Sequence, residues 1–153
     1  MAARPVGGLM DECWQAWFDG SALPNPGRIG IGLLLEAPDG SLSERSFVAR
    51  EPGCNNEAEL RALCALLELA GDCGARRLQI RGDSDIAVKY ANGIDATQVV
   101  RLQVLVQRAQ ALMAQFDEVD LRWVPRHRNT GADALSRRAL GLPEKMPARP
   151  RKR

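Results

Sequence analysis

The chain has 153 residues, of which 45% are hydrophobic, so it suits one compact domain with a substantial core and argues against disorder over most of its length. Its 21 basic and 19 acidic residues give a net charge of +2, and bulk charge therefore says little about the partner. Four cysteines without a CxxC pair, together with a single histidine, argue against a structural zinc site.

The two ends of the chain differ from its middle. Residues 1–12 contain Pro and Gly without periodicity, so we expect a flexible leader before a domain at residues 13–142. Residues 143–153 end in the basic run Arg149–Arg153, which is typical either of an arm attracted to polyanions or of a solvated tail. No signal-peptide pattern and no apolar run of membrane-spanning length is evident, so we expect a cytoplasmic protein without a membrane partner.

Three strands are predicted to open the domain. The apolar run 13–19 predicts a strand that ends on Asp19, and the turn at residues 24–27 follows, where proline fixes φ and glycine tolerates positive φ. Alternating Gly and Ile or Leu residues predict a second strand from Arg28. The Asp39–Gly40 turn then leads to a third strand that continues to about residue 50. We expect these three strands to form an antiparallel meander.

Helices separate the later strands. Asn55 or Asn56 is expected to cap a strongly apolar helix that continues to about residue 71. Alternation and helical spacing predict further elements in this order: a strand at 78–82, a short helix at 84–90, a long helix from about 96 to 116, a strand at 119–123 and a final helix from 129 or 130 to about 141. Helices between strands imply parallel crossovers, so we predict an α/β fold with helices on the faces of one sheet.

Four acids lie where apolar segments meet polar turns: Asp19, Glu59, Asp83 and Asp133. Taken singly, Asp19 is explained as a turn residue, and Asp83 and Asp133 as residues near helix N-termini, where the dipole stabilises negative charge. Glu59 is harder to explain, because it is predicted in the first turn of an apolar helix. A buried unpaired carboxylate costs several kcal/mol, so Glu59 needs a cation.

Together the four acids predict a metal site. Carboxylates delivered to one edge of a sheet repel each other unless hard cations neutralise them, and all-oxygen ligation suits Mg²⁺ or Mn²⁺. Two such ions, typically about 3.5–4 Å apart, can bind both the attacking and the leaving oxygen of a phosphodiester displacement. The pattern therefore indicates phosphoryl transfer.

Several short motifs come in the order and spacing of one known family: Phe18-Asp19-Gly20-Ser21, Asn25-Pro26-Gly27, Asn55-Asn56-Glu57-Ala58-Glu59-Leu60, Gly82-Asp83-Ser84 and the segment 124–135. Through these motifs the chain resembles type 1 ribonuclease H from roughly Trp14 to Leu140. The resemblance implies a ribonuclease H-like fold, in which a three-strand antiparallel meander and two parallel strands form a five-stranded mixed sheet with helices on both faces. It also implies an endonuclease that cuts the RNA strand of RNA–DNA hybrids and leaves 5′-phosphate and 3′-hydroxyl ends.

The resemblance further implies a role for each acid. Asp19 would bridge two metal ions, Asp133 would help to hold the ion that activates water, and Glu59 and Asp83 would hold the ion beside the leaving 3′-oxygen. The implied cofactor is Mg²⁺, two ions, with Mn²⁺ as a possible substitute. The implied partner is an RNA–DNA hybrid, and we expect a monomer because no long exposed apolar stripe is evident.

Neutral residues beside the acids are expected to bind the substrate. The resemblance implies backbone contacts for Asn25, Asn55 and Asn56, including contacts with the 2′-hydroxyl that distinguishes RNA from DNA. We also expect Gly20 and Ser21 to lie at the substrate. Helix capping stays open as an alternative for one or both residues of the Asn55–Asn56 pair.

The loop before the last acid departs from the pattern of many bacterial members. Trp123 stands where those members carry a histidine ten residues before the last acid. The chain instead has a Val-Pro-Arg form at 124–126, which makes Arg126 our first candidate for the basic role and His127 the second. A plain surface role stays open for His127.

Two further departures affect substrate binding. Cys54 and Asp85 stand where the family often has a threonine and a polar amide, so we expect weaker phosphate binding near Cys54 and a more acidic site. Between Asp83 and Asp120 there is no room for the extra helix and basic protrusion of some members, and we expect the Arg149–Arg153 tail to substitute.

Two other functions stay open at this stage. One is a nuclease on the same scaffold that processes DNA or accompanies a reverse transcriptase, although no polymerase or integrase segment is present. The other is a catalytically inactive ribonuclease H-like module that only binds nucleic acid. The intact set of four acids argues against this module, because binding alone does not require carboxylates that face phosphates.

Overall fold

The computed structural model describes residues 12–143, and the basic tail and nearly all of the expected leader lie outside these described residues. The elements are β1 (Cys13–Leu23), β2 (Arg28–Glu36), β3 (Leu42–Val48), α2 (Asn55–Asp72), β4 (Arg77–Gly82), α3 (Asp85–Ala91), α4 (Val100–Met113), β5 (Glu118–Trp123), the 3₁₀ turn η1 (Arg126–Arg128) and α5 (Thr130–Ala139). Within this described range no helix is both long enough and apolar enough to pass through a bilayer.

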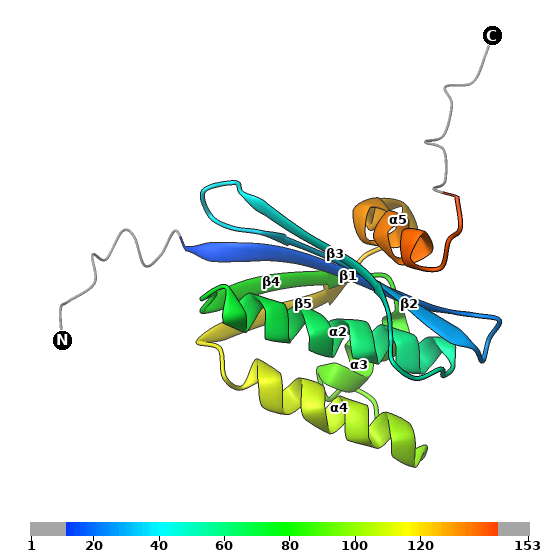
Figure 1. Cartoon of the computed structure of the whole chain (residues 1–153). Coiled ribbons are helices and arrows are strands. Elements are labelled where there is room, and N and C mark those ends of the chain that lie inside the picture. The colour runs from blue at the N-terminus through cyan, green and yellow to red at the C-terminus, as the bar shows by residue number, and fades with distance from the viewer. Residues whose placement is uncertain (1–11, 144–153) are drawn as a thin grey trace, which may run out of the picture.

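One five-stranded sheet forms the centre of the fold, with the strand order β3-β2-β1-β4-β5. Strands β1, β2 and β3 pair antiparallel, and β4 pairs parallel with both β1 and β5. Helices α2, α3 and α4 lie on one side of the sheet and α5 on the other (Figure 1). The mixed sheet with a meander, two parallel strands and helices on both faces confirms the predicted fold.

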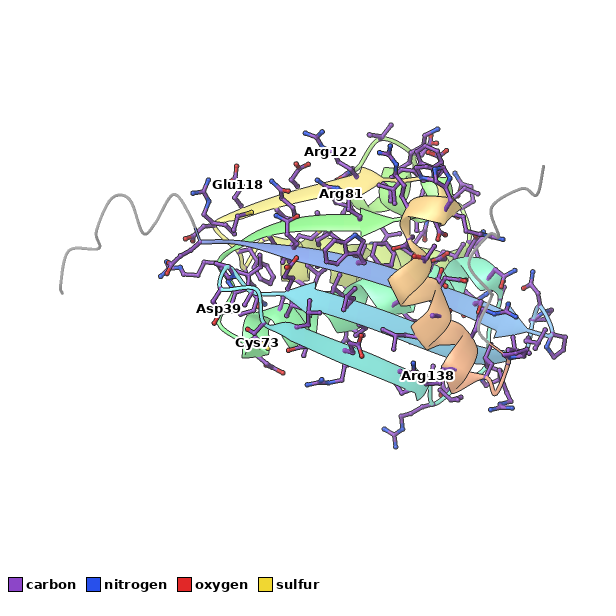
Figure 2. All side chains as sticks on the ribbon, turned by 90° about the horizontal axis from the view of Figure 1, so that it is seen from above. Asp39, Cys73, Arg81, Glu118, Arg122 and Arg138 are labelled. Atoms are coloured by element: carbon purple, nitrogen blue, oxygen red, sulfur yellow. The ribbon has the colours of Figure 1, made fainter. Side chains whose placement is uncertain are left out.

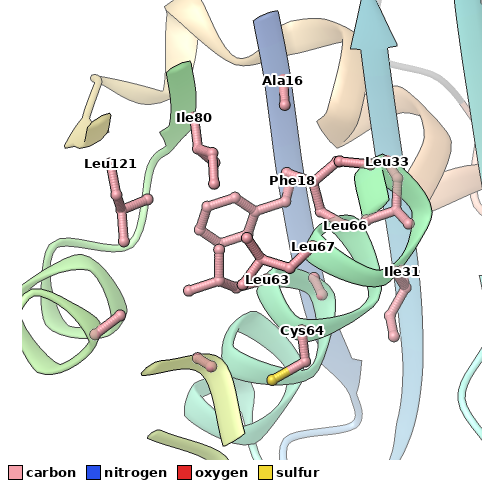
Figure 3. Close-up of a cluster of buried hydrophobic side chains, with 14 of the residues drawn as sticks. Ala16, Phe18, Ile31, Leu33, Leu63, Cys64, Leu66, Leu67, Ile80 and Leu121 are labelled. Atoms are coloured by element: carbon pink, nitrogen blue, oxygen red, sulfur yellow. The ribbon is translucent and has the colours of Figure 1, made fainter. Parts of the chain in front are cut away.

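The main core lies between the sheet and α2. Phe18 of β1 is fully buried and points towards Leu63 and Leu67 of α2 and Ile80 of β4 (Figure 3). Burying each such side chain contributes about 1.5–3 kcal/mol. A Cβ on Gly82 would lie 2.4 Å from the Phe18 ring, so the glycine at the end of β4 leaves the space that this ring occupies.

Strand β1 does not end at Asp19, and this prediction was wrong. The strand continues to Leu23 because its pairing with β2 extends to the Leu23–Arg28 pair. Its pairing with β4 stops one residue before the acid, at the Phe18–Gly82 pair. Asp19 is therefore a mid-strand residue, located where the neighbouring strand ends, and a rigid ladder on its β2 side fixes its backbone.

The cap of α2 also differs from the prediction. Cys54 is the N-cap, and Glu57 accepts a hydrogen bond from the Cys54 backbone N–H at 3.0 Å, so that Glu57 completes a capping box. Asn55 and Asn56 are the first two helical residues instead. Glu59 is consequently the fifth residue of α2 and lies in its second turn, not in its first.

One helix boundary and one turn conformation differ from the prediction for local reasons. Helix α4 begins at Val100 and not near residue 96, because the Thr97 hydroxyl accepts the Val99 N–H in a turn before the helix. In the turn before β2, Gly27 does not have positive φ. A Cβ there would lie 2.3 Å from the Pro24 carbonyl oxygen, so close approach is what requires glycine at this position.

Candidate active site

Three acids from separate elements meet at the end of β4. Asp19 in β1, Glu59 in α2 and Asp83 after β4 each contribute a carboxylate oxygen, and these oxygens all lie within 4.8 Å of one another. Asp19 is only 6% exposed. Because Asp19 and Glu59 are 40 positions apart in the sequence and Glu59 and Asp83 another 24, only the fold brings this acidic cluster together.

A glycine allows α2 to cross β1 beside the cluster. A Cβ on Gly20 would lie 2.1 Å from the Ala58 carbonyl oxygen, so no larger residue fits while the helix stays in this position. The Gly20 backbone N–H also donates to Glu59 Oε1 at 3.2 Å. Gly20 therefore both admits the helix and orients the acid that the helix carries.

Asp83 is held by two donors, Trp123 at the end of β5 and Asn129 directly before α5. The Asn129 side-chain amide donates to Asp83 Oδ2 at 3.0 Å and to the Phe18 carbonyl oxygen at 2.9 Å. The Trp123 indole N–H donates to the Asp83 carbonyl oxygen at 3.2 Å. The side chain and the backbone of Asp83 are thus both fixed.

Asp133 lies in the first turn of α5 and lines the same pocket as the acidic cluster. The pocket has a volume of about 430 Å³. The Asp133 carboxylate is not part of the group within 4.8 Å, so the structure brings three of the four expected acids into contact range and the fourth to the wall of the same pocket.

Two acids of the cluster, Asp19 and Glu59, resist ionisation. Burial raises the pKa of Asp19 from 3.8 to about 6, while the Ser136 hydrogen bond opposes this rise and the charges of Asp83 and Asp133 add to it. Burial raises the pKa of Glu59 well above its usual range, and the charges of Asp19 and Asp83 act in the same direction. A set of buried and half-buried oxygen donors with excess negative charge fits a hard divalent cation such as Mg²⁺ or Mn²⁺.

The expected substrate residues lie beside the acids. Gly20, Ser21, Asn55 and Asn56 line the pocket, whereas Asn25 is not among its lining residues. Asn25 Oδ1 accepts the Asn55 backbone N–H at 3.0 Å, so its amide satisfies the first turn of α2.

The Asn55 amide has a fixed orientation. Its Oδ1 accepts the Ala22 backbone N–H at 2.8 Å. Because a backbone N–H can only donate, the oxygen of this amide must face β1, and its NH₂ group stays available for an acceptor outside. Asn25 obeys the same constraint through its contact with the Asn55 backbone N–H.

The basic candidates separate clearly. Arg126 lines the pocket, and its charge lowers the pKa values of Asp19 and Glu59. His127 is exposed and is not among the lining residues.

Asp85 forms an ion pair with Lys89 at 3.1 Å and does not line the pocket, so the pocket does not gain the extra acid that was expected from Asp85.

Four residues of the site were missed by sequence reasoning: Trp123 as a donor, Asn129 as a donor, Ser136 and Arg137, which lines the pocket. Asn129 resembled an ordinary helix cap, although its side chain caps nothing in the structure. Ser136 carried one usable signal, because it lies three residues after Asp133 and therefore on the same face of α5.

Comparisons with known proteins agree with this geometry. The family model described as reverse transcriptase-like matches residues 17–139. Ribonuclease HI of Halobacterium salinarum is 37% identical over 126 residues, which are 82% of this chain and 63% of that protein. The bifunctional protein Rv2228c of Mycobacterium tuberculosis is 37% identical over 123 residues, which are 80% of this chain and 34% of that protein. The chain thus spans less than two thirds of the length of these relatives.

Two solved structures share the fold. The crystal structure of RNase H1 from Halobacterium salinarum superposes with a TM-score of 0.80 at 36% identity, covering 84% of this chain and 98% of that one. LC11-RNase H1 in complex with an RNA/DNA hybrid superposes with a TM-score of 0.76 at 25% identity, covering 84% of this chain and 96% of that one.

Proposed function

Because the chain belongs to the ribonuclease HI family, with a reverse transcriptase-like domain at residues 17–139, we propose that it hydrolyses the RNA strand of RNA–DNA hybrids. Cleavage would be endonucleolytic and leave 5′-phosphate and 3′-hydroxyl ends. The acidic cluster of Asp19, Glu59 and Asp83 carries this proposal, because carboxylates in such proximity, at a largely buried position, are stable only with a cation or with protons.

The cluster acids and Asp133 would hold the metal. Two Mg²⁺ ions, or Mn²⁺ in their place, would supply positive charge to the attacking and leaving oxygens of the phosphodiester. Asp19 is the best placed to contact both ions, because it contributes to the cluster and its pKa responds to the charges of both Asp83 and Asp133. Asp133 lies on the wall of the pocket, where it would complete the ligand set.

Residues at the N-terminal end of α2 would bind the sugar–phosphate backbone of the substrate. The NH₂ group of Asn55 faces outward beside the pocket, where it can donate to a phosphate or 2′-hydroxyl oxygen. Asn56, Gly20 and Ser21 line the same wall. Asn25 would act both on the substrate and on the first turn of α2, which it already caps through Oδ1.

Arg126 would supply positive charge to the pocket. As an exposed cation that lines the pocket, it is positioned to attract the substrate phosphate and the cleaved product. The Arg149–Arg153 tail would add non-specific affinity for the hybrid. Its deletion is expected to raise KM and reduce the salt dependence of binding, and an unchanged KM at physiological salt would remove this role.

A single assay tests the proposed function. End-labelled RNA–DNA hybrid, duplex DNA and duplex RNA are each incubated with the full chain in Mg²⁺, Mn²⁺ or EDTA. We expect cleavage only of the RNA strand of the hybrid, only with metal, and its loss in Asp19→Asn. Hybrid that is bound but uncut under all conditions would instead identify an inactive binding module, and cut duplex DNA would identify a DNA-processing nuclease.

A further inference from the structure

One buried hydroxyl group reaches the acidic cluster from α5, on the opposite side of the sheet from α2. Ser136 is 0% exposed, and its Oγ lies 2.6 Å from Asp19 Oδ2. A separation of about 2.5–2.7 Å is typical of a hydroxyl group that donates to an ionised carboxylate, a bond roughly twice as strong as one between neutral groups. The contact joins residues 117 positions apart in the sequence.

The same hydroxyl group also connects Asp19 to the fourth acid. Ser136 Oγ lies 2.9 Å from the Asp133 carbonyl oxygen. A serine has one hydrogen to donate, and an ionised carboxylate is the stronger of the two acceptors. Ser136 therefore donates to Asp19 and attaches this side chain to α5, the helix that carries Asp133.

The sheet is shaped to admit this contact. Gly32 of β2 lies directly opposite Asp19 in the antiparallel ladder. A Cβ on Gly32 would lie 2.5 Å from the Ser136 backbone nitrogen and 2.2 Å from the Ala132 carbonyl oxygen, and a Cβ on Gly30 would lie 2.5 Å from the Ser136 carbonyl oxygen. Helix α5 thus packs directly on the glycine backbone of β2. A side chain at position 32 would occupy the space beside Asp19 where Ser136 lies. Figure 2 shows α5 crossing the strands at this end of the sheet.

From this geometry we propose that Ser136 is a positioning residue for metal binding. It holds Asp19 Oδ2 and so leaves the other carboxylate oxygen directed at the cation that Asp19 would share with Glu59 and Asp83. Without the hydroxyl group, Oδ2 would be buried with no donor and the carboxylate would be free to rotate. This inference rests on the proposed function, because it assigns a metal ion to the acidic cluster.

A merely structural serine would anchor α5 without affecting the metal, and the chain offers a matched control for that role. Ser46 Oγ of β3 donates to the Leu135 carbonyl oxygen at 2.6 Å, the same length as the Ser136–Asp19 bond. Ser46 therefore ties the same helix to the same sheet but contacts no acid through this bond.

Direct Mn²⁺ binding separates the two roles. The full chain, Ser136→Ala and Ser46→Ala are titrated with Mn²⁺ in a calorimeter without substrate, and their thermal unfolding is measured in EDTA. Loss of a group that orients a metal ligand typically costs about 10- to 100-fold in metal affinity, so we expect a loss of this size in Ser136→Ala. Ser46→Ala is expected to keep the Mn²⁺ affinity of the parent chain while losing about as much thermal stability as Ser136→Ala.

Activity provides a second readout. In Ser136→Ala the Mg²⁺ concentration for half-maximal cleavage should rise, while kcat at saturating Mg²⁺ should return close to that of the parent chain. Should Ser136→Ala fail to fold, Ser136→Cys keeps a side chain of similar shape with a weaker donor, and it should still show a smaller loss of Mn²⁺ affinity.

The outcomes distinguish this inference from the proposed function. Equal Mn²⁺ affinities for the parent chain and the Ser136 variants, or equal losses in Ser46→Ala and Ser136→Ala, would overturn the positioning role and leave the nuclease proposal intact. A parent chain that binds Mn²⁺ but cuts no hybrid would overturn the proposed function alone, and the Ser136 comparison would still decide the positioning role.

Discussion

The two faces of the central sheet are held by different kinds of interaction. On the α2 face, Phe18 packs against leucines in an apolar core, where contacts are non-directional. On the α5 face, contact depends on bare glycine backbone and on short hydrogen bonds from Ser46 and Ser136. Phe18 and Asp19 are neighbours in β1 but depend on opposite faces. The comparison indicates that the α2 face supplies most of the stability and carries Glu59, whereas the α5 face orients Asp19 and carries Asp133.

Gly32→Ala should have the largest effect on the α5 face. The added Cβ would meet backbone atoms of α5 at 2.2 Å and 2.5 Å, so the helix must move and carry Asp133 and Ser136 away from Asp19. A displacement of about 1 Å can cost roughly 10²-fold in rate, and we expect at least this loss of kcat/KM. The measurement is hybrid cleavage, with the folded fraction checked by circular dichroism.

Gly40→Ala is the matched control for that substitution. Gly40 has φ of +89° in the hairpin turn and no atoms within 4 Å of the position of a Cβ. It should lose about 1 kcal/mol of stability through backbone strain and keep full activity. Equal loss of activity in both glycine variants would show that the close approach of α5 is not what matters.

Leu63→Ala should lower the free energy of unfolding by weakening the packing on the α2 face, without changing the rate of cleavage. Leu63 is fully buried in the main core, and such truncations cost about 2–5 kcal/mol. Urea unfolding should report this loss, whereas kcat/KM per folded molecule should stay close to that of the parent chain. Val104→Ala, at a side chain that is 58% exposed, should change neither quantity. A fall in metal affinity in Leu63→Ala would contradict the claim that the apolar packing on the α2 face stabilises the fold without affecting the metal site.

The pH dependence of the free energy of unfolding should originate in the acidic cluster, chiefly in Asp19, the neighbour of Phe18 in β1. Below pH 3.8 Asp19 is protonated in both the folded and the unfolded state, so it has no effect on stability. As pH rises towards about 6 the unfolded state loses this proton first, so the metal-free protein loses stability, by roughly 3 kcal/mol in total. Glu59 acts in the same direction.

Urea unfolding in EDTA between pH 4 and pH 8 measures this loss. Asp19→Asn should remove much of it, and saturating Mg²⁺ should offset it in the parent chain. An Asp19→Asn variant with the same pH dependence as the parent chain would contradict the assignment of the loss to this acid.

Trp123→Phe should have the smallest effect. The substitution removes the indole N–H that donates to the Asp83 carbonyl oxygen, and one such hydrogen bond contributes about 0.5–1.5 kcal/mol. We expect a modest fall in kcat/KM, of roughly 2- to 10-fold, with stability nearly unchanged because Trp123 is 49% exposed. Steady-state kinetics on the hybrid would detect the change, and unaltered kinetics would show that Asp83 needs no support from its backbone.

The parts of the molecule that were predicted from sequence depend on local patterns. Alternation in β2 and the Asp39–Gly40 turn located the meander, a strongly apolar segment located α2, and helical spacing located α4. The acids could be named because they follow such segments. The parts that were not predicted depend on distant pairs: β1 continues past Asp19 because of its ladder with β2, and the Asn129 amide turns away from capping to bind groups 111 and 46 residues away.

The central claim is that the fold gathers Asp19, Glu59 and Asp83 around a divalent cation. A crystal of the chain soaked in MnCl₂, with diffraction recorded at the manganese absorption edge, tests it directly. The account predicts an anomalous peak at about 2 Å from a carboxylate oxygen of each of these acids. Manganese bound only at surface carboxylates elsewhere, with the cluster free of any peak, would contradict it.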